Sequence, residues 1–478
     1  MGVRRPTQER VAMPFRAFKA LYENGKYGEL LNQFAHMETQ GKLASLTEED
    51  QVRCIYYRSR SLEGLWQYEE ALQVALTARA QFRSSDDKIL SLMLLITQLG
   101  ALFGLRRFEE SQKIFKEVKA IIEALTAKEQ QTGAVWIALF ESIKGNIYWA
   151  KDEWDTALEH HHRSLALHKE IGNSYDIGIS LDRIGFIHFS IDDWNTALDH
   201  YQQSLEIFEA IDNSYRVAWE LYMIGSVYRR KGELETALDY WQRSFALFET
   251  LGNDIDTAYP LSSIIILLCS ELQDHTQARK YLPQLQKLHE RIPNKAIRQQ
   301  THLAEALVLK QSKRMADKAK AQNILQELLN EKNLFFIWER FAIIHLCELL
   351  LIEVKAFGDP EVWKEAKTRI HQLYDWVQDN HLFSMIGEAL LLRAKVAAID
   401  GDLQQALKYY EQARFMAEEK KIGLLSQKVD TEQKHFEAEF EKWQTLIQRN
   451  ASLQERLTQS QIEDYMQQVQ KMVTGKKD

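Results

Sequence analysis

The chain has 478 residues, of which 20 are glycine and 6 are proline, and this scarcity of turn formers argues against a loop-rich all-β protein. Its 60 Lys and Arg residues against 68 Asp and Glu residues give a net charge of −8, which disfavours nucleic acid as a partner. The three cysteines, Cys54, Cys269 and Cys347, form no CxxC pair, as expected for unpaired thiols in a reducing cytosol.

Residues 1–13 are predicted to be a short N-terminal extension. They carry charge but no apolar segment of the kind found in secretory signals, and Pro6 breaks the myristoylation pattern. The longest apolar runs, such as 264–269, are too short to cross a bilayer. We therefore expect a cytoplasmic protein without membrane insertion.

Residues 14–134 show a weak repeat of helical segments. Each copy is recognised by one residue in a column that is small in most copies, here Leu30, Ala71 and Ser111. The spacing of about 40 residues between these positions is enough for two helices and a turn. The sequence predicts degenerate helix pairs in this region.

Residues 135–254 contain three strong copies of the same repeat, aligned without a gap. The shared columns are Gly145, Gly185 and Gly225; Ala157, Ala197 and Ala237; Ser164, Ser204 and Ser244; and Asn173, Asn213 and Asn253. Apolar residues within each copy recur at helical spacing, which indicates two antiparallel helices per copy. Small residues in the glycine and alanine columns would let the two helices approach closely.

Three adjacent histidines, His160, His161 and His162, invite interpretation as a metal site. Consecutive helical residues point about 100° apart, so the three side chains cannot converge on one ion without further ligands. The column of His161 holds Tyr201 and Trp241 in the other two copies, which indicates a core-facing ring. We therefore interpret the histidines as structural and expect no metal.

Residues 255–423 continue the array in degenerate form. The small-residue column is filled by Ala278, Ala321, Ala366 and Ala406. Together with the upstream copies, these positions predict ten helix pairs over residues 14–420. Neighbouring pairs would stack, because a single pair cannot bury its apolar face alone.

Residues 424–478 are predicted to form one long amphipathic helix with a frayed end. An apolar stripe recurs at helical spacing and includes Leu425, Val429, Phe436 and Trp443. A helix of this kind either caps the last repeat or mediates self-association or contact with a partner. The heptad spacing is not sustained long enough to indicate a coiled coil.

The strong copies resemble tetratricopeptide repeats. The second copy has a small residue, an aromatic ring three positions later, an alanine and a second aromatic ring: Gly185, His188, Ala197 and Tyr201. The repeat is longer than the basic 34-residue form and resembles the variant of kinesin light chains and bacterial peptide-sensing regulators, while the degenerate C-terminal half resembles MalT-type regulators. The resemblance implies an all-α, right-handed superhelical solenoid with a concave groove.

In this family the first helix of each pair lines the groove, so the resemblance implies which columns face inward. We predict a peptide-binding groove made by Asn146, Trp149, Asp182, Arg183, Phe186, Phe189, Trp219, Tyr222, Ser226 and Arg229. The column of Arg183 carries a ligand-binding Asn in kinesin-light-chain-like arrays, and this chain has no Asn there. The aromatic rings would supply contact area for a ligand, as hot spots do, or would instead pack against adjacent helices.

No motif of an enzyme is present: the phosphate loop, the GxSxG elbow, HExxH and GxGxxG are all missing from the sequence. We therefore predict a non-enzymatic scaffold or adaptor without cofactors that binds a protein or peptide ligand. The alternative is a ligand-responsive regulator whose superhelix changes shape when it binds a peptide or small molecule.

Overall fold

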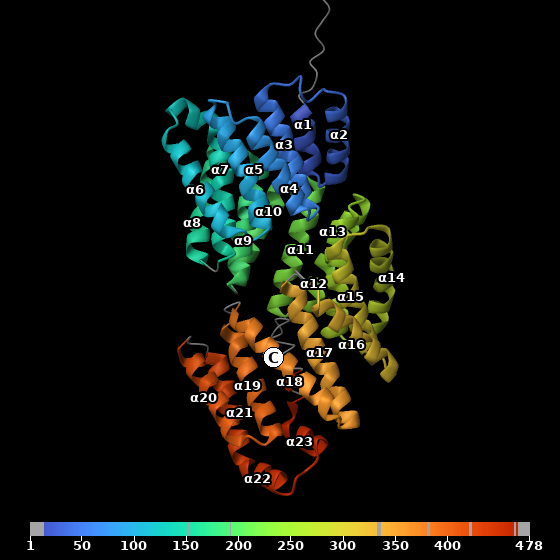
Figure 1. Ribbon diagram of the computed structural model, residues 1–478. Helices are drawn as coiled ribbons and strands as arrows, with labels where there is room; N and C mark the ends of the chain where they lie inside the picture. The colour runs from blue at the N-terminus through green and yellow to red at the C-terminus, as the bar shows by residue number, and fades with distance from the viewer. Residues whose placement is uncertain are drawn as a thin grey trace, which may run out of the picture. The chain divides into compact units, whose positions relative to one another are not determined.

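The computed structural model describes residues 14–151, 153–191, 193–331, 336–379, 383–419, 423–462 and 465–466. The predicted extension, residues 1–13, lies outside this part of the chain. Within it the secondary structure consists of 23 helices and no strands, which confirms the all-α prediction (Figure 1). No helix of this part is long and apolar enough to span a membrane.

The chain folds into two compact units. The first unit runs up to Val227 and includes Arg243–Asn253; the second comprises Tyr228–Gln242 and Asp254 onward. The helices of the first unit are α1 (Pro14–Glu23), α2 (Tyr27–Thr39), α3 (Glu48–Gly64), α4 (Tyr68–Gln81), α5 (Lys88–Gly104), α6 (Phe108–Glu123), α7 (Ala127–Trp149), α8 (Trp154–Ile171), α9 (Ser174–Ser190) and α10 (Trp194–Ala210). Both units contribute to α11 (Ser214–Lys231) and α12 (Leu234–Thr250).

The second unit continues the same alternation of helices. Its helices are α13 (Asp254–Ser270), α14 (His275–Arg291), α15 (Lys295–Lys310), α16 (Met315–Leu329), α17 (Phe336–Phe357), α18 (Pro360–Asp379), α19 (Phe383–Asp400), α20 (Leu403–Glu419), α21 (Gly423–Ala438), α22 (Phe440–Gln448) and α23 (Leu453–Ser460). The pairs α1–α2 to α19–α20 make ten, as the repeat spacing predicts.

The small-residue column explains why the helices pair. Its ten members have no exposed surface: Leu30, Ala71, Ser111, Ala157, Ala197, Ala237, Ala278, Ala321, Ala366 and Ala406. Each lies in the second helix of its pair. A larger side chain at such a position would push the two helices apart, because protein interiors are close-packed.

Two further columns make specific contacts within the pairs. The hydroxyls of Ser164, Ser204 and Ser244 donate to the carbonyls of Ala138, Gly178 and Ala218, at 2.9, 2.9 and 2.7 Å. Each bond joins the second helix to the first, and each satisfies a hydroxyl that is fully buried. The serine column therefore fixes the register of the two helices.

The asparagine column starts the next pair. The side-chain oxygen of Asn213 accepts a hydrogen bond from the backbone N–H of Arg216 at 2.9 Å, and Asn173 makes the equivalent bond with Asp176 at 3.4 Å. These are N-caps, which satisfy a backbone donor that a helix leaves without an internal partner. The repeat thus encodes both its packing and its helix boundaries.

Domain boundaries predicted from repeat strength do not coincide with helix ends throughout. The boundary expected between residues 134 and 135 falls inside α7, because similarity among the copies becomes strong only partway along that helix. After residue 423 the structure has three helices, α21, α22 and α23, where the apolar stripe predicts one long helix. The stripe remains helical, but Asn450, at φ 52°, turns the chain between α22 and α23.

The cysteines behave as the sequence predicts. Cys54, Cys269 and Cys347 are all buried and unpaired. Burial raises the pKa of the Cys54 thiol to about 12, and that of Cys269 likewise to about 12. All three are therefore small core residues that remain protonated thiols at neutral pH.

Candidate peptide-binding groove

The predicted groove residues lie on the first helices α7, α9 and α11. Every one of them is half-buried: Asn146, Trp149, Asp182, Arg183, Phe186, Phe189, Trp219, Tyr222, Ser226 and Arg229. Each side chain is thus held partly by its neighbours and keeps part of its surface within reach of solvent. The structure therefore leaves part of each predicted side chain exposed.

Aromatic rings from successive first helices contact each other in this region. The rings of Trp149 on α7 and Phe186 on α9 lie 5.0 Å apart at 52°. The indole N–H of Trp149 donates to the Ser190 hydroxyl at 3.1 Å, and this hydroxyl donates to the Phe186 carbonyl at 2.8 Å. These contacts fix the orientation of both rings and leave them partly exposed.

Trp219 on α11 is held from another side. Its ring packs edge-on against Tyr222 at 5.7 Å and against Phe248 of α12 at 5.6 Å. Phe248 is fully buried, so this contact anchors the half-buried Trp219 ring to the core. The aromatic residues therefore serve in part as packing, as the alternative interpretation expects, and in part as accessible surface.

Two carboxyl groups, Asp182 on α9 and Glu220 on α11, lie close enough to interact electrostatically. The Asp182 side chain is 16% exposed, and its Oδ2 atom lies 3.9 Å from Nε of Arg183. Burial raises the pKa of Asp182, while Arg183 and Arg216 oppose the shift. Glu220 is 1% exposed, and burial raises its pKa well above the ordinary value, with a further contribution from the neighbouring Asp182. A positive charge placed here would stabilise both ionised carboxylates.

Glu220 also has unused hydrogen-bonding capacity. Among the residues that the structure describes, its Oε2 atom and the Tyr201 hydroxyl are buried without a hydrogen-bond partner. Sequence reasoning missed Glu220 because its column holds Ser180 and Phe140 in the preceding copies, which suggests only packing. An acidic residue in a column that is uncharged in the preceding copies was the available signal.

Two of the predicted residues are committed to internal partners. Ser226 donates its hydroxyl hydrogen to the Tyr222 carbonyl at 2.9 Å. Arg229 belongs to the second unit, where Nε donates to Glu271 Oε1 at 2.7 Å and the guanidinium lies 5.5 Å from the Phe341 ring centroid. The open part of the predicted set is therefore on α7, α9 and the part of α11 in the first unit.

Within the first unit, the inner face of α3 and α5 is largely covered. Met93 and Ile96 occupy groove columns of α5 and are 0% and 1% exposed. Tyr56 of α3 is also buried, and its ring packs edge-on against Trp136 of α7 at 5.0 Å. The predicted groove residues of α7, α9 and α11 are half-buried instead.

The turn between α1 and α2 contacts the ends of later repeats in the same unit. The hydroxyls of Tyr27 and Tyr215 lie 3.0 Å apart, and the Asn213 side chain donates to the Glu23 carbonyl at 3.1 Å. Asn253 donates to the Gly25 carbonyl at 3.4 Å. The first helix pair therefore packs against the N-terminal end of α11, a contact that no local sequence pattern predicts.

The three adjacent histidines have three different surroundings. His160 is buried, with Nδ1 2.6 Å from Glu141 Oε2 and its ring stacked on Tyr148 at 5.3 Å. His161 is 1% exposed and packs on Gly145, and His162 is exposed. The described residues contain no group of three or more His, Cys, Asp or Glu side chains placed to hold a metal ion.

With this geometry in place, comparisons with known proteins identify the repeat. The tetratricopeptide repeat family model matches residues 136–210, which form most of α7 and all of α8, α9 and α10. These helices are tetratricopeptide repeats. A second model, that of the cohesin loading factor, matches residues 181–354 and overlaps the tetratricopeptide match on α9 and α10. No curated protein matches the sequence.

Solved structures of similar fold contain the same kind of helix pair. A Rap protein complexed with competence and sporulation factor is 12% identical, with a TM-score of 0.51 over 77% of this chain and 98% of that chain. The apo form of RapI is 13% identical, with a TM-score of 0.51 over 78% and 99%. The apo form of the quorum sensor NprR from B. thuringiensis is 16% identical, with a TM-score of 0.50 over 74% and 98%. At these identities the similarity establishes the fold alone.

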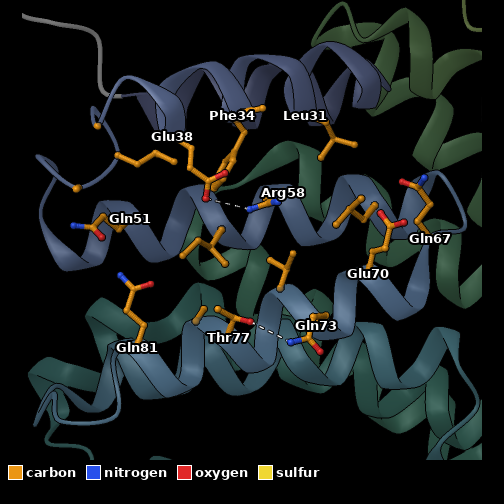
Figure 2. A pocket seen from close by; sticks show the side chains of 18 residues that line it. Leu31, Phe34, Glu38, Gln51, Arg58, Gln67, Glu70, Gln73, Thr77 and Gln81 are labelled. Atoms are coloured by element: carbon orange, nitrogen blue, oxygen red, sulfur yellow. Dashed lines mark hydrogen bonds and ion pairs between the residues drawn. The ribbon is translucent and has the colours of Figure 1, made fainter.

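A hollow of about 690 Å³ lies elsewhere in the tetratricopeptide-type array, between α2 and α4 with α3 behind it (Figure 2). Leu31, Ile55 and Val74 are among the apolar residues that line it. Its polar lining includes Glu38, Gln51, Gln67, Glu70, Gln73 and Gln81. This hollow is bordered by two second helices, so predictions made from first-helix columns do not reach it.

Proposed function

We propose that this protein is a non-catalytic adaptor whose tetratricopeptide repeats bind a peptide segment of a partner protein on the inner face of α7, α9 and α11. The contact between Trp149 and Phe186 carries the proposal, because it presents two oriented, half-exposed rings from successive repeats. Aromatic groups of this kind provide large contact area at low cost in conformational entropy.

The charges of the inner face suggest the polarity of the ligand. Burial raises the pKa values of the Asp182 and Glu220 carboxyls. A cation bound nearby would stabilise their ionised forms and would itself be attracted by them. Arg183 is 38% exposed and is available to a carboxylate or a backbone carbonyl. We infer a ligand with a Lys, an Arg or a free amino terminus beside an apolar side chain.

A capture experiment tests the proposal. The full chain and a Phe186→Ala/Trp219→Ala variant would be used to capture proteins from lysate of the native host. A matched control, Ile191→Ala/Ile211→Ala, removes two apolar side chains that are 42% and 39% exposed and lie at helix ends, outside the groove columns. We expect a partner that is retained by the wild type and the control but lost by the groove variant.

Circular dichroism of each chain would establish that it is folded before the capture. If the folded groove variant retained every protein that the wild type captures, the aromatic residues would serve packing alone, and the site assignment would be wrong. The inference that the chain is not an enzyme is separate from this test, and it rests on the absence of catalytic motifs from the sequence.

The regulator remains the alternative function. Solenoids of stacked repeats have extended concave surfaces whose curvature depends on small rotations between repeats. Small-angle scattering of the full chain with and without the captured peptide would separate the two functions. A changed radius of gyration favours the ligand-responsive regulator, and an unchanged one favours the adaptor.

A further inference from the structure

The last helix of the chain, α23, contacts earlier helices of the second unit. Helix α23 contacts α17 and α19, which are the first helices of their pairs, and in Figure 1 α19 lies between α20 and α23. We call α23, together with Ile462, Tyr465 and Met466, the tail. Because first helices form the inner face of a tetratricopeptide array, the tail lies on the side where such arrays bind peptides.

The residues under the tail occupy the groove columns of the repeat. Glu388 and Lys395 of α19 stand in the same columns as Ile179 and Phe186 of α9, when Ala406 is aligned with Ala197. Lys355 of α17 stands in the column of Lys395. On α19 the tail therefore contacts the columns that are half-buried in α9, whereas on α17 it bonds the Lys355 carbonyl and leaves that side chain exposed.

The first contacts of the tail are with the ends of α17 and α19. Gln454 donates to the Lys355 carbonyl at 3.1 Å, and Arg456 donates to the Ile399 carbonyl at 2.6 Å. Carbonyls near a helix C-terminus lack internal partners, and positive groups are favoured there. These two bonds position α23 across the ends of both helices.

Tyr465 then reaches back along α19. Its hydroxyl contacts the carboxylate of Glu388 and donates to the Glu388 carbonyl at 3.1 Å, and its ring lies 5.0 Å from Nζ of Lys395 and 4.8 Å from Nζ of Lys428. Ile462, Tyr465 and Met466 are 1%, 2% and 1% exposed. The tyrosine is thus held between two cations and bonded to one anion.

The charges under the tail have other partners. Glu388 pairs with Lys428 at 2.9 Å, and Lys395 pairs with Glu432 at 2.7 Å. Lys428 and Glu432 both belong to α21, outside the tail. Removal of the tail would leave both ion pairs intact, so it would not create the unpaired buried charge that makes such losses expensive.

From this arrangement we propose that the tail is a built-in ligand of the groove formed by α17 and α19, and that it competes with an external segment of the same chemistry. That segment is a short helix with an Arg near its middle, followed by an apolar residue and a tyrosine. The site is separate from the one proposed on α7, α9 and α11, so each proposal stands or fails independently.

The test uses the full chain with a protease site engineered at the exposed turn residues Arg449 and Asn450. The folded chain would be titrated with a fluorescent peptide of residues 451–470, before and after cleavage. An attached tail has a local concentration on the order of millimolar, so the intact chain should bind the peptide poorly. After cleavage and washing, the peptide should bind and should be displaced by its unlabelled form.

Two peptide variants make the test specific. Tyr465→Ala in the peptide removes the ring and its hydroxyl, and should weaken binding by about tenfold or more. Thr458→Ala is the matched control, because Thr458 is exposed and its hydroxyl bonds only the Gln454 carbonyl within α23. A cleaved tail that never exchanges with the peptide, or binding that does not depend on Tyr465, would overturn the proposal.

A second route requires no cleavage. The full chain carrying Tyr465→Ala has a weakened tail and an intact groove, so it should bind the wild-type peptide at least tenfold more tightly than the wild-type chain does. Equal binding by the two folded chains would identify the tail as a permanent cap. Phe186→Ala/Trp219→Ala should leave this binding unchanged, which separates the result from the fate of the function proposed above.

Discussion

Replacing His161 with Phe should make the protein less sensitive to acid. His161 is 1% exposed, and Nε2 would lie 2.5 Å from a Cβ atom added at Gly145, so the imidazole fills the space that the glycine leaves. Burial lowers its pKa to about 3, and the nearby Arg183 adds repulsion. Phenylalanine should fit this column, which holds Tyr201 and Trp241 in the neighbouring repeats.

The direction in which pH changes the free energy of unfolding follows from proton linkage. The folded pKa lies below the unfolded value of about 6.5, so between these values the unfolded chain binds more protons and the free energy of unfolding rises with pH. This group contributes little at pH 7 and destabilises the fold by about 2 kcal/mol at pH 5. Other buried histidines titrate in both chains, so their contributions cancel in the comparison.

Urea unfolding of the full-length chains, followed by circular dichroism at pH 7 and pH 5, measures the difference. The wild type should lose about 2 kcal/mol more of its unfolding free energy between the two pH values than His161→Phe does. An equal loss in the two chains would show that His161 is not buried as a neutral imidazole, and would refute the reasoning.

Three further substitutions test the packing of the repeat, each measured as the free energy of unfolding of the full chain. Gly145→Ala should destabilise the protein by about 1–3 kcal/mol because its Cβ meets His161, whereas Gly28→Ala, with nothing within 4 Å, should be neutral or stabilising. Ser204→Ala should cost about 1 kcal/mol, since the Gly178 carbonyl loses its buried donor; no change would mean that the serine column is incidental. Asn213→Ala should cost about 1 kcal/mol or more, because it removes the cap of α11 and the long-range bond to Glu23. Asn173→Ala, which removes a cap and a bond to the Asp176 carboxylate in the same helical turn, should cost less.

The helix pairs could be predicted because their contacts are local in sequence. Ala197 and Gly185 are twelve residues apart and pack within one pair, so both the spacing and the small size of the residues are visible in the chain. The serine column was visible as well, but its role was not, because the acceptor is a backbone carbonyl and leaves no sequence signal. A sequence pattern shows which side chains are small and which are apolar, but it does not show which backbone carbonyl accepts a side-chain hydrogen bond.

The long-range contacts could not be predicted for a different reason. The bond between Tyr27 and Tyr215 and the position of Tyr465 on Glu388 depend on how much each repeat rotates relative to the last one. Small rotations accumulate along a solenoid, and no column of the repeat encodes them. The apolar residues of the C-terminal region are helical, as the sequence predicts, but they lie on three helices. The turn at Asn450 sets the direction of the last of these helices.

The central claim is that a peptide segment binds the inner face of α7, α9 and α11. Hydrogen–deuterium exchange of the full chain, with and without the captured peptide, tests it most directly. We expect increased protection in these three helices around Trp149, Phe186 and Trp219. Protection confined to α2–α4, where the hollow lies, or to α17 and α19 under the tail, would contradict the claim and place the ligand at one of those sites instead.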